Sequence, residues 1–392
     1  MKICIIGSVY PRFQDDTEVP WLRRTVNELV ACGHDVTVFV PSFRGLKSHT
    51  IDGVRVKRFR YFFSKWEDLT GEEGGVNKIH KFHYKLLTIL YIVAGSTGLA
   101  LLNRKEKYDI LHVNWPFPHG IFSTFALLFR KTKVILNFHG AELLLAKRFG
   151  FVKLFLKYFI VHADAIIVNS SFTGKNVRSI YNKPVTIIPY GTTIEPSSQQ
   201  EKKKSGRHVF SLGRMIERKG FKYLVEAMSI VVREFPDAKL TIAGGGPQRD
   251  QLIEQVKTLG LENSVFLPGK VPSATLNELF TNADMFVLPA IVDKNGDTEG
   301  LGVVLVEAMT YKLPVIASNV GGIPDVIIPK VSGVLVEEKN AQSLADAIVD
   351  FMRNPDSMKQ VGDMGFSFIS KEFTWNKVID DMDRLYRKVV NN

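Results

Sequence analysis

Cysteine is scarce in this sequence, since the 392 residues include two cysteines, Cys4 and Cys32. Two residues cannot build a disulfide framework or a cysteine-based metal site, which fits a reducing compartment. The N-terminal apolar run ends at Gly7 and is too short for a signal peptide. The uncharged stretch 86–102 has Thr, Ser and Gly in its middle and falls short of the about 20 apolar residues of a membrane span. We therefore expect a buried or surface-resting helix there, with a membrane span as the less favoured alternative.

Acidic residues are under-represented in the first half of the chain. Residues 1–193 contain 27 Lys and Arg against 14 Asp and Glu, a balance of +13, whereas the remainder has 24 against 26, a balance of −2. This asymmetry predicts an anionic partner for the first half, such as nucleic acid or a membrane surface, although a solvated basic face would look the same. No nucleic-acid-binding motif is present, so we expect no nucleic acid partner.

Basic and aromatic side chains are interleaved within residues 55–85. This combination is typical of a surface that contacts an anionic bilayer, so we predict peripheral membrane contact through the first half of the chain. A basic substrate cleft, or a surface that is basic for solubility alone, would give the same pattern. The residues are Arg55, Lys57, Arg58, Arg60, Lys65, Lys78, Lys81 and Lys85, with Phe59, Tyr61, Phe62, Phe63, Trp66, Phe82 and Tyr84.

Short apolar, β-branched runs alternate with longer helical patterns along almost the whole chain. Nearly continuous apolar strands separated by helices predict parallel sheets that are covered on both faces. The polar stretch 194–206 interrupts the alternation and reads as a linker between two domains, 1–193 and 207–373. Ligands of such sheets bind beyond the carboxyl ends of the strands. The predicted strands are 2–6, 35–40, 54–59, 110–113, 134–138, 165–168 and 185–188, then 209–212, 239–243, 265–267, 285–288, 315–317 and 334–336.

Two glutamates follow the predicted strand 285–288. Gly300 and Gly302 suit a tight loop, and the apolar run after them suits a helix that begins near Gly302. Glu299 then lies in the loop and Glu307 two turns into the helix, an offset of about 80° that lets both carboxylates face one site. The helix N-terminus suits a diphosphate. The alternative is that Glu299 caps the helix and Glu307 is solvated.

Cations follow the first strand of the second domain. Gly213 allows a sharp turn, after which Arg214 and Lys219 are carried past the end of the strand. A guanidinium and an ammonium can neutralise a leaving nucleoside diphosphate without a metal, although two solvated cations are the plainer interpretation. We expect no essential metal, because the pair Asp381 and Asp383 falls in a helical pattern in which residues two apart face different ways.

Together these motifs resemble the GT-B retaining glycosyltransferases of glycosyltransferase family 4, also called glycosyl transferases group 1. The family has two glutamates with the spacing of Glu299 and Glu307, and cationic motifs that match 213–214 and 219–220; the segment 316–325 is also similar. The resemblance implies two tandem Rossmann-like doubly wound domains that face each other across a cleft. It also implies donor contacts from Arg214, Lys219, Glu307, Gly213, Gly300, Leu301, Gly302 and the loop Gly269, Lys270 and Val271, with Glu299 next to the reacting sugar.

The first domain matches the family more loosely. The segment 137–142 resembles the family's histidine-glycine motif, which implies that His139 lies beside the donor sugar as a second catalytic residue. The helix 374–390 is expected to pack back on this domain. The glycine pair that the family often has after the first strand, where it approaches the donor phosphate, is missing here. We expect the acceptor side to include Asp16, Thr17, Glu18 and Glu142 instead.

These features and the family resemblance imply a cytoplasmic, metal-independent hexosyltransferase that retains configuration. The co-substrate is expected to be a UDP- or GDP-sugar, with no other cofactor. The acceptor is expected to be a glycan or lipid-linked saccharide of cell-surface polysaccharide or glycolipid biosynthesis, at the inner face of the membrane. The alternatives are a GT-B sugar-nucleotide epimerase, which acts on the donor alone, and a non-catalytic basic protein that binds membrane surfaces.

Overall fold

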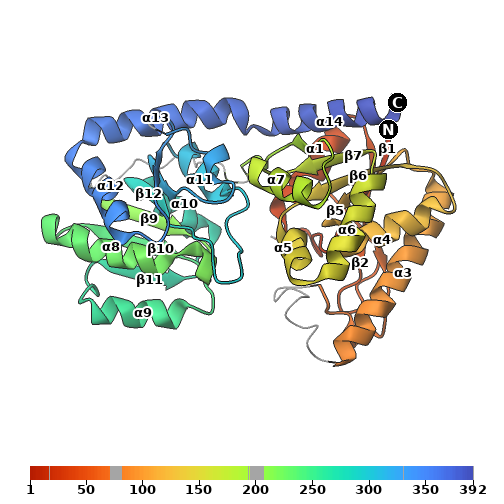
Figure 1. Ribbon diagram of the computed structural model, residues 1–392, viewed down its shortest axis with the longest axis horizontal. Helices are drawn as coiled ribbons and strands as arrows, with labels where there is room; N and C mark the ends of the chain where they lie inside the picture. The colour runs from red at the N-terminus through yellow and green to blue at the C-terminus, as the bar shows by residue number, and fades with distance from the viewer. Residues whose placement is uncertain (17, 71–81, 193, 195–206, 330, 392) are drawn as a thin grey trace. The chain divides into compact units, whose positions relative to one another are not determined.

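The computed structural model describes residues 1–16, 18–70, 82–192, 194, 207–329 and 331–391 (Figure 1). The chain divides into two compact units: Met1–Pro189 together with Val378–Asn392, and Tyr190–Lys377. The predicted linker 194–206 lies outside the described residues except for Ile194.

The first unit is built on an eight-stranded sheet in the order β3-β4-β2-β1-β5-β6-β7-β8. All neighbours are parallel except β3, which pairs antiparallel with β4 at the edge. β1 is central and buried, so the chain reverses its direction of travel across the sheet between β1 and β5. The strands are β1 (Lys2–Ile6), β2 (Asp35–Pro41), β3 (His49–Ile51), β4 (Val54–Phe59), β5 (Ile110–Asn114), β6 (Lys133–Phe138), β7 (Ala165–Val168) and β8 (Thr186–Ile187).

Helices cover both faces of this sheet. The largest core cluster joins Cys4 and Ile6 of β1 to helices α3, α4 and α6. On the opposite face, the Tyr386 hydroxyl of helix α14 lies 2.5 Å from Nδ1 of His112 on β5, so residues 378–391 belong to this unit. The helices are α1 (Pro20–Ala31), η1 (Ser64–Trp66), α3 (Phe82–Glu106), α4 (Pro116–Leu127), α5 (Ala141–Arg148), α6 (Gly150–His162), α7 (Ser171–Ile180) and α14 (Trp375–Asn391).

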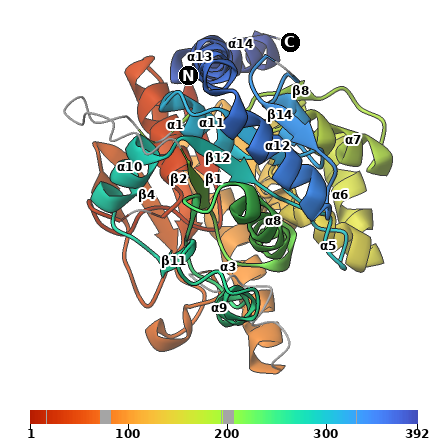
Figure 2. The same ribbon diagram turned by 90° about the vertical axis from the view of Figure 1, so that its left-hand side faces the viewer.

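The second unit has a six-stranded, wholly parallel sheet in the order β11-β10-β9-β12-β13-β14. One core cluster lies under α8, α9 and α12, and another under α10, α11 and α13, so both faces are covered (Figure 2). The strands are β9 (His208–Leu212), β10 (Lys239–Ala243), β11 (Val265–Gly269), β12 (Met285–Leu288), β13 (Val315–Ser318) and β14 (Val334–Val336). The helices are η2 (Glu217–Lys219), α8 (Phe221–Glu234), α9 (Arg249–Thr258), α10 (Ser273–Asn282), α11 (Val303–Thr310), η3 (Ile323–Asp325), α12 (Ala341–Arg353) and α13 (Pro355–Glu372).

The strand predictions are confirmed, six of them to the residue: 2–6, 54–59, 165–168, 239–243, 285–288 and 334–336. The edge strand β3 was missed, because three residues in a polar stretch carry no readable alternation. Lys312 follows the end of helix α11 and has a φ of 56°, a conformation that glycine adopts at less cost.

Candidate functional site

The predicted donor residues of the second unit lie at one edge of its sheet. β9 is the first strand of the unit and pairs with both β10 and β12, so the order of strands reverses between β9 and β12. The loops that follow these two strands, 213–220 and 289–302, leave the same edge because the strands are parallel. This reversal point is where open α/β sheets bind ligands.

The structure brings Lys219 and Glu299 into direct contact at this point. Lys219 Nζ lies 2.6 Å from Glu299 Oε2, and Arg218 Nη1 lies 2.9 Å from the same oxygen. The Lys219 side chain is 9% exposed and that of Glu299 is 12% exposed. Arg218 also approaches Asp297, with Nε 3.5 Å from Oδ2. Arg218 and Asp297 were not predicted from the sequence.

These two cations determine the charge of Glu299. Burial disfavours its ionised form, but the attraction of Lys219 and then Arg218, together with their hydrogen bonds, outweighs burial and lowers the pKa of Glu299 to about 2. Glu299 is therefore a carboxylate at physiological pH. It does not cap α11, whose N-cap Gly302 has no side-chain cap and whose first turn has no acidic residue. The helix-cap alternative for Glu299 is wrong.

Close backbone contacts fix both halves of this ion pair. Gly220 has a φ of 66°, and a Cβ there would lie 1.9 Å from the carbonyl oxygen of Pro289. The N–H of Ile291 donates to the Arg218 carbonyl at 2.8 Å, which ties the two loops together. The carbonyl of Glu299 accepts the N–H of Gly322 at 3.0 Å. The loops thus present their side chains on a fixed backbone.

Arg214 differs from Lys219 in being exposed. It has no ion-pair partner within the part of the chain that the structure describes. Its loop is supported from beneath by the glycines after β10: a Cβ on Gly244 would lie 2.0 Å from the Gly213 carbonyl oxygen, and one on Gly246 would lie 2.4 Å from that of Met215. The glycine run is therefore a tightly packed turn. A ligand can reach the Arg214 guanidinium without displacing a salt bridge.

The remaining predicted donor residues also follow carboxyl ends of strands. Gly269 ends β11 with a φ of 79°, and its carbonyl accepts the N–H of Gly244 at 2.8 Å. Lys270 is exposed and Val271 is half-buried. Gly302 has a φ of 87° where α11 begins. Glu307 is 8% exposed, so the alternative that it is solvated is wrong. Burial and then the charge of Glu307 raise the pKa of Tyr311 to about 12.

In the first unit, His139 follows β6 and packs against two tryptophans that also contact each other. Its ring centroid is 4.9 Å from that of Trp21 and 4.8 Å from that of Trp115. Asn114 donates through Nδ2 to the Ile6 carbonyl, so its Oδ1 accepts, and the His139 Nε2 atom 3.0 Å away carries the proton. Burial, and to a lesser degree His112, lowers the pKa of His139 to about 3. The imidazole is neutral at physiological pH. The aromatic pair was not predicted.

The predicted acceptor-side residues make contacts within their own loops. Asp16 accepts the N–H groups of Arg12 and Glu18 at 2.8 and 3.1 Å. Glu18 lies 3.7 Å from the Arg12 guanidinium. Glu142 Oε1 accepts the N–H of His139 at 2.7 Å. Thr17 lies outside the described residues. These contacts hold the loops, and the role of Asp16, Thr17, Glu18 and Glu142 in acceptor binding stays a prediction.

Glu142 offers a pH-dependent test of this local structure. Burial raises its pKa to about 7, against 4.5 for an ordinary glutamate, and its Oε2 has no hydrogen-bond partner within the described ranges. A carboxyl with a higher pKa in the folded than in the unfolded chain stabilises the folded state while it is protonated. This contribution is complete below about pH 4.5 and is lost as the pH rises through about 7. Between pH 5 and 8, Glu142 should therefore lower the free energy of unfolding of the wild type by up to about 3 kcal/mol. We expect Glu142→Gln to lack this part of the loss.

Urea unfolding at the two pH values measures this effect. Glu28→Gln, which removes a carboxyl from the surface of α1, is the control for the loss of one charge. Equal losses of unfolding free energy in the wild type and in Glu142→Gln between pH 5 and 8 would refute the assignment.

The arginines of residues 55–66 are less available than the sequence indicated, whereas Phe62, Phe63, Lys65 and Trp66 are exposed. Arg58 is 9% exposed and donates to the carbonyls of Pro41, Tyr10 and Pro11, and burial lowers its pKa to about 10. Arg55 pairs with Asp35 and Glu106, and Arg60 pairs with Glu67. The prediction of a basic surface is therefore wrong for Arg58. Lys78 and Lys81 lie outside the described residues.

Within the ranges that the structure describes, no group of three or more His, Cys, Asp or Glu side chains is arranged to hold a metal ion.

Comparisons with known proteins match both parts of the chain. Residues 193–367 match the family Glycosyl transferases group 1, and residues 21–195 match Glycosyltransferase Family 4. N-acetyl-alpha-D-glucosaminyl L-malate synthase of Bacillus anthracis is 24% identical over 337 residues, 82% of this chain and 84% of that protein. GDP-mannose-dependent alpha-(1-6)-phosphatidylinositol monomannoside mannosyltransferase of Mycobacterium tuberculosis is 28% identical over 226 residues, 54% of this chain and 59% of that protein.

A solved structure supports the same fold. HepE of Anabaena in complex with UDP is 16% identical, with a TM-score of 0.73 over 99% of this chain and 100% of that chain. The two α/β units and this structural similarity show a GT-B fold, and the two family matches show a glycosyltransferase. The chain belongs to the group 1 glycosyltransferases of glycosyltransferase family 4.

Proposed function

We propose that this protein transfers a hexose-type sugar from a UDP- or GDP-sugar to a glycan or lipid-linked saccharide, with retention of configuration and without a metal. The observation that carries the proposal is the contact between buried Lys219 and Glu299 at the reversal point of the second sheet. A diphosphate at this edge meets cations on one side and a carboxylate on the other, which suits a donor with a charged leaving group and a sugar.

In this proposal Arg214, Lys219 and the N-terminal N–H groups of α11 bind the diphosphate. The negative charge that develops on the leaving oxygen is stabilised by the ammonium, by the guanidinium and by the helix dipole. Glu307, with its carboxylate largely withdrawn from water, holds the ribose diol. Arg218 still neutralises part of the negative charge of Glu299 when Lys219 binds the phosphate.

Glu299, ionised at physiological pH, lies beside the reacting sugar and stabilises its developing oxocarbenium charge. The bond between the anomeric carbon and the diphosphate oxygen breaks, and the acceptor hydroxyl oxygen forms the new bond on the same face. The acceptor proton passes to the departing diphosphate oxygen, so no protein base is required.

The names of the relatives support the donor and acceptor classes. The mycobacterial relative is described as GDP-mannose-dependent and acts on a phosphatidylinositol monomannoside, and HepE was solved with UDP. We extend these classes to this chain and propose that it acts in cell-surface polysaccharide or glycolipid biosynthesis, in the cytoplasm and at the inner face of the membrane.

Incubation of the purified protein with UDP- and GDP-sugars tests this proposal. Thermal shift identifies the donor, because a ligand that binds the folded state raises the melting temperature. The product made with a saccharide acceptor should have the anomeric configuration of the donor, as read by NMR. An inverted product contradicts the retaining mechanism, and conversion of the donor alone to its epimer contradicts glycosyl transfer.

A further inference from the structure

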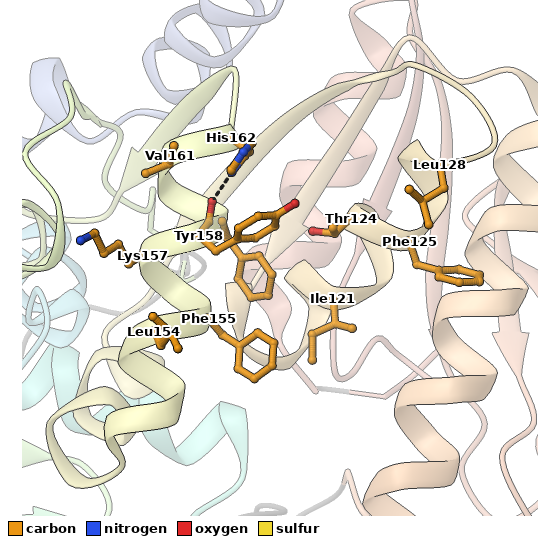
Figure 3. A pocket seen from close by; sticks show the side chains of 11 residues that line it. Ile121, Thr124, Phe125, Leu128, Leu154, Phe155, Lys157, Tyr158, Val161 and His162 are labelled. Carbon is orange, nitrogen blue, oxygen red and sulfur yellow. Dashed lines mark hydrogen bonds between the residues drawn. The ribbon is translucent and has the colours of Figure 1, made fainter.

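An open apolar pocket lies on the first unit between helices α4 and α6. Its volume is about 660 Å³, and its lining is almost entirely carbon. Ile121, Phe125 and Leu128 come from α4 and the residue after it, and Leu154, Phe155 and Tyr158 come from α6 (Figure 3). A cavity with so few polar groups suits a hydrocarbon chain better than a sugar or a nucleotide.

Helix α6 is apolar on both of its sides. Val152, Leu156 and Phe159 face the core and are at most 5% exposed. The opposite side has a second apolar stripe at i, i+3, i+4 and i+7, formed by Phe151, Leu154, Phe155 and Tyr158 with exposures of 58, 70, 43 and 46%. A surface helix of a soluble protein normally has polar residues there. A continuous exposed apolar face of this kind indicates an interaction surface.

Helix α3 packs on the other side of α4 and repeats this pattern (Figure 1). Leu86, Ile89, Val93 and Leu101 form an exposed stripe, 52 to 69% exposed. Among the described residues, α3 is the one helix long and apolar enough to cross a membrane by length and composition, with a mean hydropathy of 1.8. It is nevertheless held by the domain, because a Cβ on Gly95 would lie 2.4 Å from the ring of buried Phe122 on α4. It therefore lies against the sheet with one apolar side outward.

Basic residues outnumber acidic residues in the segment that contains these helices. Residues 82–163 include eleven Lys and Arg but three acidic residues, Glu106, Asp109 and Glu142. Glu106 pairs with Lys2 and Arg55, Asp109 accepts the N–H of Lys2, and Glu142 is buried. The basic residues are Lys85, Arg104, Lys105, Lys107, Arg130, Lys131, Lys133, Lys147, Arg148, Lys153 and Lys157.

We infer that the exposed faces of α3, α4 and α6 dock on an anionic lipid bilayer, with lipid acyl chains entering the pocket between α4 and α6. Apolar side chains insert between the acyl chains while the surrounding Lys and Arg contact anionic headgroups. This inference places membrane contact on these helices and not on residues 55–66, whose arginines are engaged by carboxylates and backbone carbonyls.

Charge complementarity favours lipid over a second copy of the chain. A two-fold dimer through this surface would bring the same basic residues of both copies together, which is unfavourable. An anionic bilayer supplies apolar chains and negative charge in one partner, so it satisfies both features of the surface. The inference is independent of the proposed function, since it needs neither donor nor acceptor.

Sedimentation of the purified full-length chain with vesicles tests the inference, without any sugar nucleotide. The vesicles contain phosphatidylglycerol with phosphatidylcholine, or phosphatidylcholine alone. We expect binding to the anionic vesicles that weakens as salt is added. The double variant Leu128→Asp/Leu154→Asp, at positions 75 and 70% exposed, should bind at least about tenfold more weakly. Phe63→Asp, at a position 71% exposed in the segment 55–66, is the matched control and should bind as the wild type does.

Three outcomes would overturn the inference. The wild type fails to bind anionic vesicles; the double variant binds as tightly as the wild type or loses no more than Phe63→Asp does; or light scattering shows a wild-type dimer that the double variant converts to monomer. Thermal shift by the sugar nucleotide should be the same in the wild type and the double variant, which separates this test from that of the proposed function.

Discussion

Lys219→Met is expected to lower kcat at least about a hundredfold, because the methionine keeps the volume of the side chain but removes the ammonium that would stabilise the leaving diphosphate. The same change removes one of the two cations that contact Glu299 in the described structure and leaves Arg218. The pKa of Glu299 should therefore rise. Steady-state kinetics with donor and acceptor at saturation measures the effect on kcat.

Stability has to be measured alongside, because removing one member of a buried pair costs about 3 kcal/mol or more. Thermal unfolding of Lys219→Met shows whether the folded fraction accounts for the loss. Lys222→Met, which removes an exposed lysine three residues later on α8, is the matched control and should retain activity. A kcat within threefold of the wild type in folded Lys219→Met would contradict the assigned role.

Arg214→Ala is expected to lower kcat/KM for the donor more than about tenfold with little change in stability. The guanidinium is exposed and lacks an ion-pair partner in the described structure, so its removal leaves no buried charge behind. Its charge-assisted bonds to a diphosphate would form only when the ligand binds. The affinity for the donor should also fall less steeply with increasing salt concentration in the variant than in the wild type.

Arg233→Ala, an exposed arginine on α8, is the control for a general effect of surface charge and should behave as the wild type. A loss of kcat/KM that is the same in Arg214→Ala and Arg233→Ala would mean that Arg214 acts through the overall field of the protein and does not contact the phosphate.

The sequence predicted the two sheets well, because strands buried on both faces are continuous apolar runs whatever the packing around them. Runs such as 239–243 and 285–288 can be placed without knowing their neighbours. The edge strand β3 could not be placed, since half of its environment is solvent and its residues need not be apolar.

The ion pair of the candidate site was only partly predictable. Lys219 and Glu299 were identified by their motifs, but each was predicted to contact a different part of the donor, and nothing in the motifs indicated that the two side chains meet. Arg218 was missed because a run of three charged residues does not show which side chain turns inward, and that is decided by the φ of 66° at Gly220.

The burial of long polar side chains was also difficult to predict from the sequence. Arg58 stands among exposed basic residues in the sequence, yet its guanidinium is enclosed by the carbonyls of the β1–α1 loop. Conversely, the outward apolar stripe of α6 follows the same helical spacing as its buried one, so periodicity alone could not tell which side meets the core.

The most direct test of diphosphate binding at the reversal point of the second sheet is a calorimetric titration of UDP and GDP, with a chelator present, into the wild type and into the double variant Arg214→Ala/Lys219→Met. We predict that one of the two nucleotides binds the wild type and that the double variant binds it at least about a hundredfold more weakly. Equal affinity in the two proteins would contradict the claim that the reversal point of the second sheet binds the diphosphate.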